Sequence, residues 1–174
     1  MQRLIILALV VFGLLGSVIE VRATEGEFSN VVLKVGQHTL KEKYDVFSKK
    51  NKEYELKLRS IDGDGYLLLS AKEKEKSIQV SSSPIGRGDG RYSRPRQGEI
   101  LLMFEGEDNP YSLGGNSFFL RTTITSVQKN SEPLRKIAAK KSMFAKIVVL
   151  ERSKVLKIDL SGVKKMLKTA KFIA

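Results

Sequence analysis

The feature that most constrains the fold of this chain is a run in which apolar and charged residues alternate without a break. Residues 53–59 place a tyrosine and two leucines on one side and charged side chains on the other. Because successive side chains of a β-strand point to opposite faces of a sheet, this period of two predicts a half-buried strand. The sequence Asp-Gly-Asp-Gly at residues 62–65 follows, and it predicts a hairpin turn into a second strand at residues 66–69.

Other segments carry related patterns. Residues 100–104 are a continuous apolar run between two glutamates, which predicts a central strand buried on both faces. Residues 118–127 are rich in aromatic and β-branched side chains and predict one long strand. The turn-rich residues 106–116 between them predict a loop. Shorter strand patterns occur at residues 31–35, 40–46, 77–81, 144–150 and 155–160.

Two helices are predicted in the last quarter of the chain. The sequence Ser131-Glu132-Pro133 is typical of a helix start with Ser131 as the cap, and this helix is expected to run to about Lys141. Ser161 is expected to cap a final helix that has an apolar stripe on one side and lysines on the other. We expect the stripe to pack on the domain rather than to lie on an anionic membrane. Its members are Val163, Met166, Leu167 and Ala170.

These patterns together predict the fold class. We expect a mainly β domain, an antiparallel sandwich or barrel of about eight to nine strands with one internal helix and a C-terminal amphipathic helix. This outline resembles that of the lipid-carrying calycin barrels. The Gly-x-Trp motif of lipocalins is absent, since the chain contains no tryptophan.

The first 23 residues have the layout of a secretory signal peptide. A short basic start is followed by an apolar run over residues 4–19 and by Ala23 at the expected cut. A retained membrane anchor is the alternative, but this run of 16 residues is shorter than the roughly 20 that a spanning helix needs. We therefore expect a signal peptide at residues 1–23, a single β-rich domain at residues 24–174, and a periplasmic or extracellular location after cleavage.

The charge of the chain is concentrated at its C-terminal end. The formal net charge is +12, and residues 129–174 hold 13 lysines and arginines against three acids. Such an asymmetry is an argument about binding partners and not about the fold. The chain also has no cysteine, which rules out a disulfide-linked partner, a lipid-modified cysteine, a thiolate nucleophile and cysteine-ligated zinc.

A second basic region lies in a long predicted loop over residues 81–98. It contains Arg87, Arg91, Arg94 and Arg96, with Tyr92 among them. Arginine side chains suit phosphate and sulfate, and a tyrosine can stack on a ring or base. The alternative is a solvated loop whose arginines only aid solubility. The Arg-Gly-Asp tripeptide at residues 87–89 is either an adhesive motif or a chance match.

No residue pattern predicts catalysis, a metal site or a cofactor. His38 is the only histidine, and it lacks a nearby nucleophile motif or ligand partners. A calcium loop starting at Asp62 would place Asp64 and Glu73 at ligand positions, but it would put Tyr66 and Leu67 where an oxygen ligand and glycine are needed. The hairpin interpretation of this segment is therefore preferred.

The sequence thus predicts an exported, non-enzymatic protein that binds an anionic partner: acidic lipid, a cell-envelope polymer, glycosaminoglycan or nucleic acid. A peripheral membrane contact belongs to this expectation. Two alternatives stay open, a β-barrel carrier of an apolar ligand with Phe104, Phe118, Phe119, Leu120 and Ile124 lining its cavity, and a secreted hydrolase such as a nuclease. The expected anion-binding residues are Arg87, Arg91, Arg94, Arg96, Arg135, Lys136, Lys140, Lys141, Lys164, Lys165, Lys168 and Lys171.

Overall fold

The structure is a computed structural model that describes residues 27–45, 52–83, 96–118, 122–149 and 152–174. The expected signal peptide at residues 1–23 lies outside these ranges. Every described strand and helix lies within residues 27–174, so a chain that begins at Thr24 contains the whole described fold.

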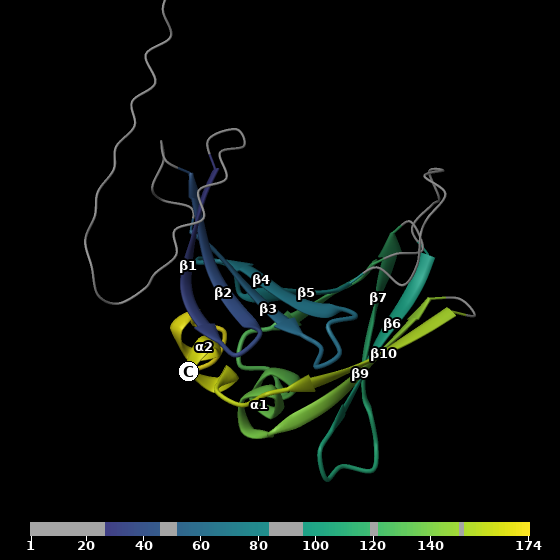
Figure 1. The fold of residues 1–174 in the computed structure, drawn as a ribbon. Coiled ribbons are helices and arrows are strands. Elements are labelled where there is room, and N and C mark those ends of the chain that lie inside the picture. The colour runs from purple at the N-terminus through teal and green to yellow at the C-terminus, as the bar shows by residue number, and fades with distance from the viewer. Residues whose placement is uncertain (1–26, 46–51, 84–95, 119–121, 150–151) are drawn as a thin grey trace, which may run out of the picture.

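Ten strands form a single antiparallel sheet that curls into a half-barrel (Figure 1). The order across the sheet is β1-β2-β3-β4-β5-β8-β7-β6-β9-β10, so β1 and β10 are its two edges. The predicted class, mainly β and antiparallel with two helices, is confirmed. The strands are β1 (Glu27–Val35), β2 (His38–Asp45), β3 (Glu53–Arg59), β4 (Tyr66–Lys72), β5 (Ser77–Ser82), β6 (Arg96–Phe104), β7 (Tyr111–Phe118), β8 (Thr122–Gln128), β9 (Ser142–Val149) and β10 (Arg152–Asp159).

The alternating run of β3 folds as its period predicts. Leu56 and Leu58 are fully buried, whereas Arg59, the last residue of β3, is exposed. The Asp-Gly segment forms the β3–β4 hairpin, in which Arg59 pairs with Tyr66 and Gly63 adopts a φ of 77° that favours glycine. The hairpin prediction is confirmed.

Two strand predictions and one loop prediction in the middle of the chain are wrong in detail. Residues 100–104 are buried on one face only, because Leu101 and Met103 lie half-buried on the outer side of β6. Residues 118–127 are not one strand, since β7 ends at Phe118 and β8 begins at Thr122. The predicted loop instead contains β7, whose Gly115 lies so close to β8 that an added Cβ would stand 2.3 Å from the Ile124 carbonyl oxygen.

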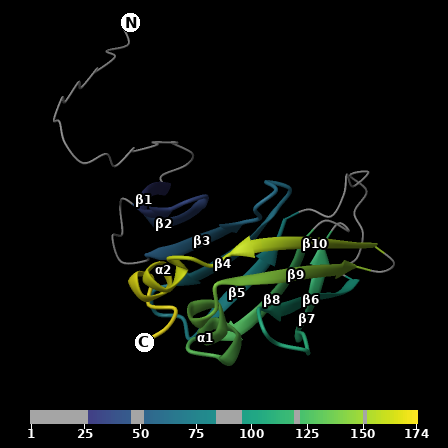
Figure 2. The same ribbon diagram turned by 60° about the horizontal axis from the view of Figure 1, so that its bottom comes forward.

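Helices α1 (Glu132–Ala139) and α2 (Val163–Thr169) cover the concave side of the curled sheet (Figures 1 and 2). Pro133, Leu134 and Ile137 of α1 are buried in the same core as the inward leucines of the sheet. The stripe of α2 is likewise buried: Val163, Met166 and Leu167 are each 0% exposed. The expectation that this stripe packs on the domain is confirmed.

The two helix caps differ from the sequence prediction. Ser131 is the N-cap residue of α1, but its hydroxyl makes no capping hydrogen bond, and α1 ends at Ala139. Gly162, not Ser161, precedes α2, with a φ of 77°. The backbone N–H of Ser161 donates instead to the Asp159 carboxylate at 2.9 Å, so this acid ends β10 and turns the chain into the helix.

The edge strand β10 is hydrogen-bonded to the β3–β4 hairpin and to the start of β2. The backbone N–H of Ile61, in the β3–β4 turn, donates to the carbonyl oxygen of Lys157 on β10 at 2.8 Å. His38 at the start of β2 bridges the same region, as described below. None of the helices in the described ranges has the length and hydropathy to cross a bilayer.

We predict that Phe172→Ala destabilises the chain 24–174 by about 3–5 kcal/mol. Phe172 follows α2 and is 0% exposed, so the substitution leaves a cavity where α2 meets the sheet. Urea denaturation measures the loss. Phe144→Ala is the matched control, since Phe144 is 45% exposed on the outer face, and it should cost less than about 1 kcal/mol. Equal effects of the two substitutions would contradict the described packing.

Candidate anion-binding surface

The described part of the basic segment, residues 129–149 and 152–174, folds into one layer. It comprises α1, β9, β10 and α2, which lie next to one another in Figure 2. β9 and β10 form a hairpin, α1 contacts α2, and the N–H of Leu160 donates to the Lys141 carbonyl oxygen at 2.8 Å. The cations of this segment are therefore gathered on neighbouring elements rather than scattered over the molecule.

Helix α2 presents the least compensated charge in this layer. Lys164, Lys165 and Lys168 are exposed, and no residue from Leu160 to the C-terminus is acidic. None of the three forms an ion pair with any residue that the structure describes. Because the opposite side of α2 is buried in the core, these lysines are held on the outside of a fixed helix. We refer to Lys164, Lys165 and Lys168 as the lysine face.

Lys171, beyond the end of α2, is partly neutralised. Its ammonium lies 3.1 Å from the carboxylate of Glu73 in the β4–β5 turn, although its side chain is 66% exposed. The hydrogen bond and the charge of Lys171 lower the pKa of Glu73, so this carboxylate stays ionised beside the lysine. Lys171 is therefore less available to an outside anion than the lysine face.

Two lysines of α1 are also engaged within the fold. Glu107, in the β6–β7 turn, pairs with Lys136 at 2.8 Å and with Lys140 at 3.4 Å. Lys136 also pairs with Glu132 one turn earlier at 3.2 Å. The hydrogen bond from Lys136 lowers the pKa of Glu107, and the same bond raises the pKa of Lys136. Lys136 and Lys140 are thus partly neutralised. Arg135 on α1 and Lys141, two residues after the end of α1, are exposed.

Of the arginines in the arginine-rich region, the structure describes only the backbone of Arg96. Arg87, Arg91, Arg94 and the tripeptide at residues 87–89 lie outside the described residues. Arg96 begins β6, and Phe104 at the other end of this strand lies 5.8 Å below the Lys136 ammonium. Eight residues of extended strand span about 26 Å, so the backbone of Arg96 is remote from α1. The backbone of Arg96 and the lysines of α1 are therefore at different places on the molecule.

His38 has a structural role. Its Nε2 lies 2.5 Å from the Asp159 carbonyl oxygen, and its Nδ1 accepts a hydrogen bond from the Arg59 N–H at 3.1 Å. The neutral ring with its proton on Nε2 satisfies both contacts. His38 is also only 5% exposed, so both nitrogens are committed to joining β2, β3 and β10.

The acidic residues of the rejected calcium loop do not come together in the structure. Asp62 and Asp64 are exposed in the β3–β4 turn, while Glu73 lies beside Lys171. Among the residues that the structure describes, no three histidine or acidic side chains gather as metal ligands would.

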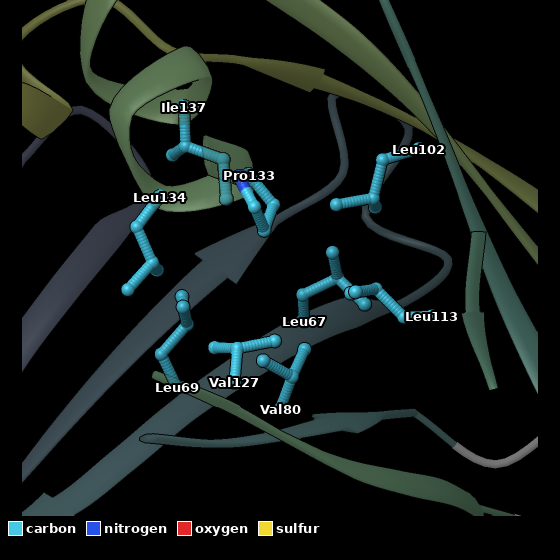
Figure 3. Close-up of a pocket in the computed structure, with 9 residues that line it drawn as sticks. All are labelled: Leu67, Leu69, Val80, Leu102, Leu113, Val127, Pro133, Leu134 and Ile137. Atoms are coloured by element: carbon cyan, nitrogen blue, oxygen red, sulfur yellow. The ribbon is translucent and has the colours of Figure 1, made fainter. Parts of the chain in front are cut away.

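An apolar hollow lies between α1 and the sheet (Figure 3). Its volume is about 10 Å³, close to the least space that a single water needs. Leu67, Leu102 and Leu134 are among the side chains that converge on it. A lipid would have to displace α1 to enter this hollow.

The residues expected to line a carrier cavity do not form the lining of one cavity in the described part of the chain. Phe104 is buried in the core and Ile124 is half-buried, whereas Phe119 and Leu120 lie outside the described residues and only the backbone of Phe118 is described. The calycin-like outline implied a closed barrel, but the sheet is open between β1 and β10.

Comparisons with protein-family models, with curated proteins and with solved structures find no match for this chain. The geometry of the molecule therefore carries the functional argument without support from relatives.

We predict that Glu107→Gln strengthens binding to a heparin column, so that elution requires more salt. The substitution releases Lys136 and Lys140 from their shared carboxylate. Glu55→Gln is the matched control: it removes the same charge and one ion pair, that of Glu55 with Lys43 at 2.6 Å on the outer face of the sheet. If both variants shift the elution equally, only the net charge matters and the α1 lysines are not part of the contact.

Proposed function

We propose that this is an exported, non-enzymatic protein that binds an anionic partner through the lysine face of α2, with Arg135 and Lys141 beside it. The observation that carries the proposal is the exposure of Lys164, Lys165 and Lys168 without ion-pair partners among the described residues, on a helix whose other side is buried. Acidic lipid, an envelope polymer, glycosaminoglycan and nucleic acid all carry the phosphate, sulfate or carboxylate groups that such a surface attracts.

The mechanism of binding is electrostatic. Lysine ammonium groups attract a dense row of negative charges, and neutralising that row releases its counterions into solution. The helix is fixed by its buried stripe, so it needs no folding step on binding. Such binding weakens steeply as salt rises, because added ions both screen the charges and oppose counterion release.

The arginine-rich region enters the proposal as a separate contact. Arg87, Arg91, Arg94 and Arg96 have the side chains that suit phosphate or sulfate. Since Arg96 lies at the far end of β6 from α1, a partner that touches both regions has to be extended, as a polymer or a membrane surface is. A small anion would engage one region only.

We predict that the triple variant Lys164→Gln/Lys165→Gln/Lys168→Gln elutes from a heparin column at clearly lower salt than the native chain 24–174. For a duplex DNA probe, the slope of log K against log salt should fall by up to about 2.7, because each neutralised phosphate contributes roughly 0.9. Thermal unfolding should be unchanged, since all three side chains are exposed.

The matched control removes three cations elsewhere, with Lys34→Gln/Lys41→Gln/Arg59→Gln on the outer face of β1–β3. Its net charge equals that of the triple variant, so a specific lysine face predicts a much smaller shift. Elution of the native chain near physiological salt, about 0.15 M, or equal shifts of the two triple variants, would overturn the proposal.

The export part of the proposal predicts the start of the mature chain. Expression of the full sequence in a bacterium should release a protein whose intact mass and first residues correspond to Thr24–Ala174. Recovery of the uncut chain in the membrane fraction would show that residues 1–23 act as an anchor.

A further inference from the structure

The outer face of the β6–β9–β10 part of the sheet is unusually apolar. Phe144 on β9 is 45% exposed and Val155 on β10 is 55% exposed, and they are two of the four large apolar side chains that the structure shows exposed in its described ranges. Their strand neighbours Met143 and Leu156 are 0% exposed, so the register of the sheet itself turns Phe144 and Val155 outward.

The pairing of the strands makes these side chains part of one patch. Phe144 lies between Met103 of β6 and Lys157 of β10, and the next outward row places Lys146 between Leu101 and Val155. Directly opposite residues of an antiparallel pair have Cβ atoms about 5 Å apart, and diagonal neighbours are within reach of an aromatic ring. Phe144 and Val155 are such diagonal neighbours. We call Leu101, Met103, Phe144, Val148 and Val155 the outer apolar patch.

The charges within the outer apolar patch are lysines. Lys146 and Lys157 alternate with its apolar members, and the Lys157 ammonium lies 5.8 Å from the centre of the Phe144 ring. Lysines of this kind can lay their stems along apolar surface and extend their ammonium groups outward. The acids at the margin are hydrogen-bonded within the fold: Glu99 accepts from Ser112, Glu105 from Ser142 and Asp159 from Ser161.

We propose that the anionic partner is a lipid bilayer and that the outer apolar patch rests on it, with Phe144 and Val155 entering the boundary between headgroups and acyl chains. This inference rests on the proposed function and names its partner class. A soluble polyanion offers no apolar phase for these side chains, whereas an anionic bilayer offers both an apolar phase and negative headgroups. A second copy of this chain fits less well, because two strongly basic molecules repel each other.

This mode of contact differs from that of an amphipathic membrane helix. The apolar stripe of α2 is buried in the core and cannot face lipid without opening the fold. In the proposed contact the sheet supplies the apolar side chains instead, and α2, which follows β10 directly in the chain, supplies lysines.

A single fluorophore tests this placement, because the chain contains no tryptophan. Phe144→Trp in the chain 24–174 is titrated with vesicles of phosphatidylcholine and phosphatidylglycerol, and with vesicles of phosphatidylcholine alone. We expect a blue shift with the anionic vesicles and quenching when their acyl chains are brominated. Val32→Trp is the matched control at an apolar position on β1 that is 41% exposed, and its emission should not change.

A second variant separates this inference from the proposed function. Phe144→Ser/Val155→Ser should lower the affinity for the anionic vesicles about tenfold or more, while retention on heparin and the thermal midpoint stay unchanged. Unchanged vesicle binding by this variant would overturn the outer apolar patch as the contact. The same holds if the Phe144→Trp emission stays constant while the protein sediments with vesicles.

Two further outcomes are equally decisive. Retention on heparin that depends on the lysine face, without binding to the anionic vesicles, would overturn the bilayer and leave the proposed function standing. Light scattering that shows a dimer for the native chain and a monomer for Phe144→Ser/Val155→Ser would assign the patch to a second copy of this chain, again against the proposal.

Discussion

The burial of α2 against the concave side of the sheet is the contact on which the rest of the structure depends. A curled antiparallel sheet has one apolar face that must be covered, and a closed barrel covers it with its own strands. Here the sheet stays open between β1 and β10, so helices fill the hollow. The inward leucines of β2, β3 and β4 belong to the same hydrophobic core as the stripe of α2 and Phe172, and these side chains are all at most 1% exposed except Ala170 at 2%. A chain without cysteines relies on such packing for its stability.

The burial of α2 also determines on which side of the helix its lysines lie. A helix with one side buried must present its other side to solvent, and in α2 that side carries Lys164, Lys165 and Lys168. The fold also limits the charge: Glu107 engages two lysines of α1, and Glu73 engages Lys171. Helices α1 and α2 therefore cover the concave side of the half-barrel, and α2 bears lysines that have no ion-pair partner among the described residues. In the contact that we propose, a partner attracted by those cations also touches the outer apolar patch, which lies on β6, β9 and β10.

Local sequence patterns predict the elements in which one face is buried and the other is exposed to solvent. The alternation of β3, the Asp-Gly turn and the stripe of α2 each depend on burial of a single face, and the structure confirms them. The errors arise where a distant segment decides the outcome. Residues 111–118 form β7 because they pair with β6 and β8, and Gly115 lets β8 approach too closely for any side chain; no pattern in residues 106–116 reveals these neighbours. At the start of α2 the cause is local instead: Gly162 takes the cap position, and the Ser161 N–H donates to the Asp159 carboxylate.

The candidate site likewise has features that local patterns predict and features that only the fold reveals. The outward direction of the α2 lysines follows from the stripe alone. The pairing of Lys136 and Lys140 with Glu107 does not, because 29 residues separate Lys136 from Glu107 along the chain and only the fold brings them together. The outer apolar patch was missed for a related reason. The run at residues 100–104 predicts a strand buried on both faces, and residues 144–150 predict a strand without showing which face is buried. Only the strand order and register show that Phe144 and Val155 face outward as neighbours.

Native-state hydrogen exchange of α2 tests most directly whether this helix is both a part of the core and a fixed platform for the lysines. If α2 covers the apolar face of the sheet, its hydrogen-bonded amides should exchange only through openings whose free energy approaches that of global unfolding, as for the amides of β3 and β4. Exchange of the α2 amides at the rate of a frayed chain end, while β3 and β4 stay protected, would show that the sheet is stable without the helix. That result would contradict the account.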